Sequence, residues 1–393
     1  MSIFDFDLYN TEVEDFLPYI NEGVFPKRIN AFYNDGTTHY LPLLWHSENS
    51  AEILNCEYEN PFILQRADPY IFKGPDGYYY FTASYPAFGS AENGYDRIIL
   101  RRSKTVKGLA TAEEKTVWTA HKSGVMSRHI WAPEIHFIKD KWYIFFAAGE
   151  KENIWNIRPF VLMCEGSDPY VDSWAECGIM KASSGDKMSF RNFSLDMTYF
   201  EHKGNHYLIW AQIEGDSSLF MATINPDEPW QLTSKPILLT KPEYSWEKVN
   251  HSVNEGASVL RIKDKIYIFF SASGTGAEYC MGALYADIDA DLMKTESWIK
   301  TDHPLLETKD LDGEVGPGHN SFVTDENGNL LLVYHSRPAS HLNEKCSTYC
   351  SESLYDPCRH TRIKYVFISA DGIPKINMKK DEIIAAKNRI IKL

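Results

Sequence analysis

Five residues able to transfer protons or bind a ligand recur at near-equal intervals along the 393-residue chain. Each precedes a run of aromatic and β-branched side chains, a composition typical of β-strands, and lies 9 to 12 residues ahead of one aligned position within that run. Aligned on one position within these runs, the units are 64, 64, 60 and 64 residues apart. The five residues are Asp68, Glu134, Asp196, Glu255 and His319.

Three of these residues, Asp68, Asp196 and Glu255, are acids from the first, third and fourth units. Glycoside hydrolysis uses such a set, because one carboxylic acid protonates the leaving oxygen while a carboxylate activates water on the far side of the sugar. Carboxyl groups that approach from different sides favour an inverting enzyme, in which they stand ~6.5–9.5 Å apart. An acid at the start of a strand can equally be a turn former or a solvated side chain. The inference therefore depends on the finding that all three acids lie at corresponding places in their repeat units.

The elements that must position these residues are predicted to be β-hairpins. In the fourth unit a strand begins near Glu255, turns at Lys263–Lys265 and returns as the run Ile266–Phe270. A period of 60 to 64 residues exceeds the ~40–50 of most propeller blades, so long loops must join the strands. An all-β repeat admits a propeller or a solenoid. Only a propeller brings the first strand of every unit to one channel, so we predict an all-β, five-bladed β-propeller.

The repeat also divides the chain. Residues 61–393 contain the five units and are predicted to form the catalytic propeller domain. Residues 1–60 lie outside the repeat and are expected to be an N-terminal extension that packs on the main body or on a neighbouring subunit. A partly disordered lead-in is the alternative.

Composition narrows the class of protein. A formal charge of −14 and a pI near 5.4 argue against nucleic acid or an anionic membrane as a partner, since both require clustered Lys and Arg. No apolar window approaches the ~20 residues of a membrane span. The first residues do not resemble a signal peptide, and an odd number of cysteines, seven, is typical of a reducing compartment. These features predict a cytoplasmic location and leave the oligomeric state open.

At the repeated residues the chain resembles glycoside hydrolase family 43, the five-bladed propeller enzymes that act on arabinose- and xylose-containing polysaccharides. The matching segments are Arg66–Tyr70, Ile130–His136, Ser194–Asp196, Val253–Gly256 and Gly316–Ser321. Within the family the chain is most similar to the exo-acting α-L-arabinofuranosidases, through Tyr95–Ser103, Lys115–Trp118 and Tyr355–Arg362.

The resemblance implies a role for each carboxylate. Asp68 matches the general base, Glu255 the general acid, and Asp196 the third carboxylate, which orients the acid and raises its pKa. A negative charge close to Glu255 disfavours ionisation of that carboxyl, which agrees with this division. Glu134 matches no proton-transfer position and is expected to support the structure.

The resemblance also implies three further site residues. His319 matches a channel histidine that sits beside a calcium or other ion held largely through water, or that is satisfied by hydrogen bonds alone. Arg337 matches an arginine that contacts sugar hydroxyls. Trp131 would offer an apolar platform to a sugar face, although a tryptophan here could simply belong to the core.

The function implied is an inverting glycoside hydrolase that releases terminal α-L-arabinofuranose from arabino-oligosaccharides or arabinan-type chains. No cofactor is expected for the chemistry. A β-xylosidase on the same fold is the alternative, because both sugars present similar hydroxyls to the acid and base. A further alternative is a non-catalytic carbohydrate-binding propeller, but the complete set of three carboxylates disfavours it.

A second cluster of possible ligands lies near the C-terminus. Cys346, Cys350, Cys358 and His360 could outline a zinc site. Their spacing lacks the paired CxxC units of structural zinc sites, so free thiols are the favoured interpretation.

Overall fold

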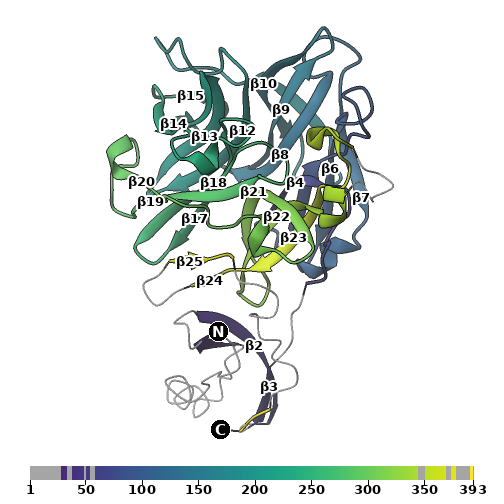
Figure 1. The fold of residues 1–393 in the computed structure, drawn as a ribbon, viewed down its shortest axis with the longest axis vertical. Coiled ribbons are helices and arrows are strands. Elements are labelled where there is room, and N and C mark those ends of the chain that lie inside the picture. Colours follow the sequence, from purple (N-terminus) through teal and green to yellow (C-terminus); the bar gives the residue numbers. More distant parts are fainter. Residues whose placement is uncertain are drawn as a thin grey trace.

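The computed structural model of this protein describes seven stretches of the chain: residues 28–32, 38–47, 50–53, 58–343, 350–368, 373–377 and 390–392. Within them the fold is almost entirely β. Five antiparallel sheets radiate around a common axis, and a small separate sheet lies below them in the view of Figure 1. The structure confirms the all-β, five-bladed β-propeller.

Each blade is built from consecutive strands, and the first strand of each is the one that carries a repeated polar residue. The first blade is β4 (Ala67–Lys73), β5 (Tyr79–Ser84), β6 (Arg97–Ser103) and β7 (Glu114–Thr119). The second is β8 (Arg128–Ile138), β9 (Lys141–Glu150), β10 (Asn153–Cys164) and β11 (Trp174–Ile179). The third is β12 (Ser194–His202), β13 (Asn205–Glu214), β14 (Asp216–Asn225), β15 (Glu228–Leu232) and β16 (Ile237–Thr240). The fourth is β17 (Asn254–Ile262), β18 (Lys265–Ala272), β19 (Cys280–Asp287) and β20 (Ile299–Lys300). The fifth is β21 (Glu314–Thr324), β22 (Leu330–Pro338) and β23 (His360–Tyr365).

The second strand of each blade is the aromatic run seen in the sequence, and it is buried on both faces. In β9, for example, Ile144 and Phe146 pack against the first blade, whereas Tyr143 and Phe145 pack against the third. This alternation follows from the period of two along a strand. The same division recurs at the other junctions between blades, so the core of the described residues consists of layers between the sheets.

A short segment ahead of the first blade closes the ring. The backbone N–H of Phe62 donates to the carbonyl of Thr361 at 2.8 Å, and the N–H of Thr361 donates to the carbonyl of Ile63 at 2.9 Å. The side chain of Asn60 makes two further hydrogen bonds to the backbone of Ile363. This segment therefore lies along β23 and joins the beginning of the propeller to its last blade.

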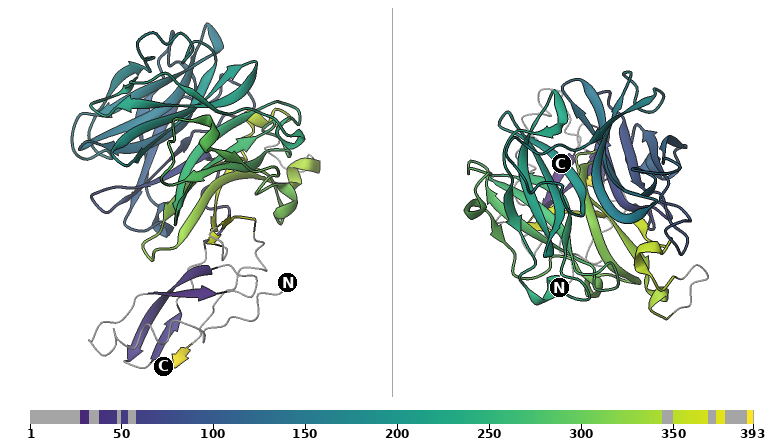
Figure 2. Two further views of the ribbon diagram at one scale, coloured as in Figure 1. Left: turned by 90° about the vertical axis from the view of Figure 1, so that its left-hand side faces the viewer. Right: turned by 90° about the horizontal axis from the view of Figure 1, so that it is seen from above.

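The small sheet contains strands from both ends of the chain. Its order is β25-β24-β2-β3-β26, with β1 also paired to β2. Figure 2 shows the purple N-terminal strands beside the yellow C-terminal strand, outside the ring of blades. The strands are β1 (Arg28–Phe32), β2 (Thr38–Ser47), β3 (Ser50–Ile53), β24 (Phe367–Ile368), β25 (Pro374–Lys375) and β26 (Ile390–Lys392).

The helices among the described residues are single 3₁₀ turns in the connections. None of them is long and apolar enough to cross a membrane. They are η1 (Lys107–Ala110), η2 (Ser245–Glu247), η3 (Thr295–Ser297), η4 (Thr308–Asp310), η5 (Ala339–Asn343) and η6 (Ser353–Tyr355).

Candidate active site

The first strand of every blade contains a β-bulge at an equivalent position, and a residue in the left-handed region lies within it. These residues are Asp68, Ala132, Asp196, Gly256 and His319, with φ of 52°, 46°, 55°, 57° and 47°. In each strand the pairing register with the second strand shifts across this position. A bulge of this kind re-aims a side chain and often lies beside an active site.

The bulges reveal which residues are equivalent between blades. Glu134 lies two residues beyond the bulge residue of its strand, and Glu255 lies one residue before its own. Glu134 is buried and bonded to His136, with 2.9 Å between Oε2 and Nε2, and it does not line the central cavity. Spacing alone places Glu134 in the series, whereas the cavity separates it from the other four residues, all of which line it.

A cavity of about 1180 Å³ opens at the end of the channel where the bulges lie. All six predicted site residues line it: Asp68, Trp131, Asp196, Glu255, His319 and Arg337. The fold therefore brings together residues that are as much as 269 positions apart, counted from 68 to 337.

Asp68 is surrounded by hydrogen-bond donors and positive charge. The hydroxyl of Ser84 donates to its Oδ2 at 2.5 Å, and the guanidinium of Arg359 lies 3.5 Å from its Oδ1. Burial raises the pKa of Asp68, but the charges of His319, Arg359 and His335 and the Ser84 hydroxyl outweigh burial and lower it to about 2. Asp68 is therefore ionised at any pH near neutrality.

Glu255 lies in the opposite electrostatic environment. Burial raises the pKa of its carboxyl to about 7, although the hydroxyl of Tyr279 donates to Oε1 at 2.8 Å and opposes the shift. Burial and the nearby carboxylates of Glu255 and Asp68 also raise the pKa of Asp196 well above its usual value. The site therefore combines one ionised carboxylate with two carboxyl groups that favour the protonated form, a pattern that assigns acid and base roles in other enzymes.

His319 lies between the two aspartates. Its Nδ1 is 3.4 Å from Oδ1 of Asp68 and 3.7 Å from Oδ2 of Asp196. The backbone N–H of His319 donates to the hydroxyl of Ser271 at 2.7 Å, which ties this bulge to the fourth blade. Burial lowers the pKa of His319, and the carboxylate of Asp68 opposes this shift.

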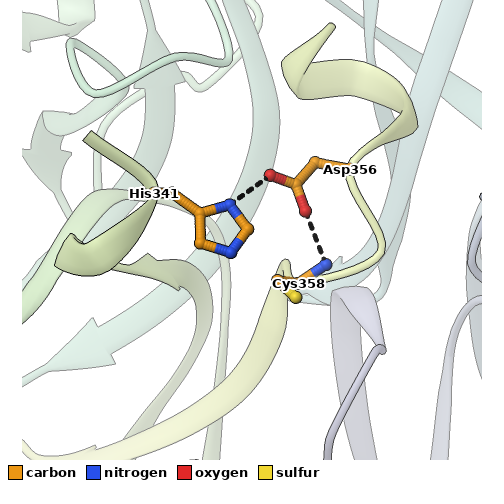
Figure 3. Close-up of side chains that lie close together, drawn as sticks. All are labelled: His341, Asp356 and Cys358. Atoms are coloured by element: carbon orange, nitrogen blue, oxygen red, sulfur yellow. Dashed lines mark hydrogen bonds and ion pairs between the residues drawn. The ribbon is translucent and has the colours of Figure 1, made fainter. Parts of the chain in front are cut away.

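Arg337 belongs to a buried polar group at one wall of the cavity. Oδ2 of Asp356 lies 2.6 Å from Nδ1 of His341 (Figure 3). The same oxygen lies 3.6 Å from the guanidinium of Arg337. Oδ1 of Asp356 accepts the backbone N–H of Cys358 at 2.8 Å. The charge of Asp356 is thus compensated within the protein.

The side chains of His341, Asp356 and Cys358 could hold a metal ion, because they bring nitrogen, oxygen and sulfur ligands close together. The zinc cluster suggested by the sequence is different. Cys346 lies outside the described residues, and Nδ1 of His360 accepts the backbone N–H of Gln65 at 2.9 Å. Cys350 is a free thiol, and Cys358 is buried beside Asp356.

Aromatic rings form another wall of the cavity. The ring of His129 stacks on Trp131 with 4.1 Å between centroids and 19° between planes. Trp155 lies 5.2 Å from His129 and 6.2 Å from Trp131, measured between centroids. Trp131 is only 6% exposed, whereas Trp155 is 51% exposed, and both line the cavity.

Besides Ser84, three residues that contact the carboxylates were not predicted. They are Arg359, whose guanidinium faces Asp68; Tyr279, which donates to Glu255; and His335, whose Nδ1 accepts the backbone N–H of Asp68 at 3.1 Å. Arg359 falls within the stretch Tyr355–Arg362 that carried the family resemblance, but a single arginine in a loop does not by itself indicate an inward position. Tyr279 reaches Glu255 because Gly318 lacks a side chain, and a Cβ there would lie 2.0 Å from the tyrosine ring.

Comparison with known proteins found a matching family and several relatives. The family described as "Glycosyl hydrolases family 43" matches residues 58–374. The extracellular exo-α-(1→5)-L-arabinofuranosidase of Streptomyces avermitilis is 43% identical over 326 residues, which cover 82% of this chain and 63% of the relative. The enzyme of the same name from Streptomyces chartreusis is 43% identical over 285 residues, which cover 71% of this chain and 82% of the relative.

The crystal structure of an α-L-arabinofuranosidase from Lactobacillus brevis superposes with a TM-score of 0.70 at 39% identity, covering 82% of this chain and 96% of that one. The chain spans less than two thirds of the S. avermitilis relative.

The expected cytoplasmic location is contradicted by these relatives, since both Streptomyces enzymes are named as extracellular. The expectation used net charge and cysteine count among its grounds. Charge reports on solubility and association, and free thiols report on redox chemistry, so neither specifies a compartment.

Proposed function

Because this chain belongs to glycosyl hydrolase family 43, we propose that it is an inverting, exo-acting α-L-arabinofuranosidase. Its substrate would be an arabino-oligosaccharide or an arabinan-type chain, from which it releases the terminal α-L-arabinofuranose. The names of the relatives at 39% to 43% identity support the sugar, and the names of the two Streptomyces enzymes support the exo mode. The observation that carries the proposal is the divergence of two pKa values in one cavity, about 2 for Asp68 and about 7 for Glu255.

In the proposed mechanism Asp68 is the general base. Its carboxylate takes a proton from a water molecule as the water oxygen bonds to the anomeric carbon. Glu255 is the general acid and gives its proton to the glycosidic oxygen as the bond between that oxygen and the anomeric carbon breaks. Asp196 helps to keep Glu255 protonated, because two neighbouring carboxyl groups do not ionise together readily.

The remaining side chains of the cavity bind the terminal sugar in this proposal. Arg337 donates hydrogen bonds to sugar hydroxyls and is held toward the cavity by Asp356. Arg359 keeps Asp68 ionised and in place. Trp131 supplies apolar surface next to these polar groups.

A calcium ion beside His319 is a separate part of the proposal. Among the described residues His319 belongs to no group of three closely spaced metal ligands, so its surroundings do not fit an ion bound directly by side chains alone. An ion held largely through water is compatible with the carboxylates near His319. Exhaustive chelation should then lower the melting temperature or the rate, and added calcium should restore it. This response to chelation should vanish in His319→Ala. A wild-type protein that does not respond to chelation would support the alternative, in which hydrogen bonds alone satisfy His319.

The experiment that tests the sugar compares two aryl glycosides. Nitrophenol should be released from nitrophenyl α-L-arabinofuranoside with a kcat/KM well above that for nitrophenyl β-D-xylopyranoside. The reverse preference would make the protein a β-xylosidase, and turnover of neither would support a carbohydrate-binding propeller. Proton NMR of the first-formed arabinose tests the stereochemistry, and a retained anomeric configuration would contradict the single displacement.

A further inference from the structure

Trp155 differs from the other aromatic residues around the cavity in how much of it is exposed. It is 51% exposed, whereas Trp131 is 6% exposed and Tyr279 is 1% exposed. A single exposed apolar residue needs no explanation on an ordinary surface. Trp155, however, lines the same cavity as the three carboxylates, where a flat apolar face is available to a ligand.

The position of Trp155 is fixed by its surroundings. The register between β9 and β10 jumps from Asn153 to Arg158, so the residues between them leave the regular ladder. Nδ1 of His129 lies 2.9 Å from the carbonyl oxygen of Ile154, immediately before Trp155. Burial lowers the pKa of His129 to about 4. The neutral ring can therefore donate from Nδ1 to Ile154 and accept at Nε2 from the hydroxyl of Tyr355, 3.1 Å away.

Exposure increases from the carboxylates toward the rim of the cavity. Asp68 and Asp196 are each 8% exposed, whereas Ile213 and Trp155 on the cavity lining are 39% and 51% exposed. A terminal sugar whose anomeric carbon reacts beside the carboxylates must lie at the buried end. The sugar that carries the leaving oxygen must then extend toward the exposed end.

We infer that Trp155 is the platform for this second sugar, the one that departs with the leaving oxygen. One face of a sugar ring presents C–H groups that can pack on the indole, while its hydroxyls stay in water. This inference rests on the proposed function. It gives Trp155 a role in binding substrates longer than one sugar and no role in the proton transfers.

A contact made to the second sugar in both the ground state and the transition state changes KM and leaves kcat unaltered. Trp155→Ala should therefore raise KM for α-(1→5)-arabinotriose by about tenfold, the size of effect that one buried aromatic anchor commonly has. KM for methyl α-L-arabinofuranoside should stay the same, because its one-carbon leaving group does not extend to the indole.

Two variants serve as controls. Trp155→Phe keeps a flat ring and should retain most of the affinity for arabinotriose. Phe88→Ala removes an aromatic residue that is 46% exposed but does not line the cavity, and it should change neither substrate. An equal rise in KM on both substrates for Trp155→Ala, or no rise on either, would overturn the inference.

Calorimetry makes the test independent of turnover. In a Glu255→Gln background, Trp155→Ala should weaken the binding of arabinotriose by about the same factor and leave the binding of free arabinose unchanged. A wild-type protein that does not cleave arabinotriose would contradict the proposed function. In that case the loss or retention of arabinotriose affinity still decides the role of Trp155.

Discussion

The backbone N–H of Gly256 donates a hydrogen bond of 3.0 Å to Oδ2 of Asp196. Gly256 directly follows Glu255, so this bond ties a carboxylate of the third blade to the strand of the fourth blade that carries the proposed acid. The two carboxyl groups are thus held in a fixed relation between two sheets. Because this bond fixes the position of Asp196 relative to Glu255, it also sets how strongly the ionisation of one carboxyl affects the other.

Replacing Asp196 by Asn tests the electrostatic side of this relation. Asp196 and Glu255 titrate as a pair, because ionisation of one carboxyl disfavours ionisation of the other. Asn cannot ionise, so the apparent pKa of the remaining acid should fall. Activity requires the acid to be protonated and is lost as pH rises through that pKa, which is about 7 for Glu255 in the wild type. The alkaline limb of kcat/KM should move to lower pH, while the acid limb stays in place. An unmoved alkaline limb would show that Asp196 does not influence the acid.

Replacing Gly256 by Ala tests the geometric side. Gly256 has φ of +57°, and a Cβ there would lie 3.2 Å from Nδ1 of His319. We expect a loss of about 1–2 kcal/mol in the free energy of unfolding from the left-handed backbone, together with a lower kcat because His319 is displaced. Gly204→Ala is the matched control, since its φ is +76° but nothing lies near its Cβ. It should lose similar stability in urea and keep its activity.

Arg359 should control the acid limb of the pH profile. Its positive charge lowers the pKa of Asp68, whose carboxylate must be ionised to act as a base. Arg359→Ala therefore raises the pKa of Asp68, and the acid limb of kcat/KM should move to higher pH. Arg337→Ala is the control, because Arg337 lies next to Asp356. It should raise KM without moving the acid limb, and a shift of equal size in both variants would refute the pairing of Arg359 with Asp68.

Glu255 and Asp68 should differ in their dependence on the leaving group. A sugar alkoxide needs a proton to depart, whereas nitrophenolate leaves without one. Glu255→Ala should therefore reduce kcat on arabino-oligosaccharide by the ~10²–10⁴-fold typical of lost proton transfer, and reduce it much less on nitrophenyl arabinofuranoside. Asp68→Ala should reduce both rates together, because both reactions need activated water. Equal losses on both substrates for Glu255→Ala would mean that another carboxylate is the acid.

The buried ion pair between Lys300 and Glu247 should be important for stability. Glu247 is fully buried, and it also accepts a hydrogen bond of 2.9 Å from Nδ2 of Asn254, the neighbour of Glu255. Lys300→Met leaves this carboxylate without its cation and should lower the free energy of unfolding by about 3–5 kcal/mol.

Lys139→Met is the comparison for this variant, since the pair of Lys139 with Asp227 is largely exposed and should contribute little. Urea unfolding measures both. A loss for Lys300→Met no larger than that for Lys139→Met would contradict the role of the buried pair.

The amino-acid sequence by itself determined the repeat and the family resemblance. The hairpin pattern is local, because the apolar side chains of a strand such as Ile266–Phe270 themselves indicate that the strand is buried. Asp68, Asp196 and Glu255 lie at corresponding places in their repeat units. They can meet in one site only if the units surround a common axis, as the blades of a closed propeller do. Sequence pattern was enough to predict the propeller.

Only the tertiary structure decided which residues face one another. Glu134 fits the spacing of the series, yet its bulge turns Ala132 to the position that Asp68 holds in the first blade. The opposite ionisation of Asp68 and Glu255 depends on burial of the Glu255 carboxyl and on Arg359, which reaches Asp68 from another part of the chain. Backbone bulges, closure of the ring and the electrostatic field of distant groups are long-range properties, so no local pattern of residues contains them.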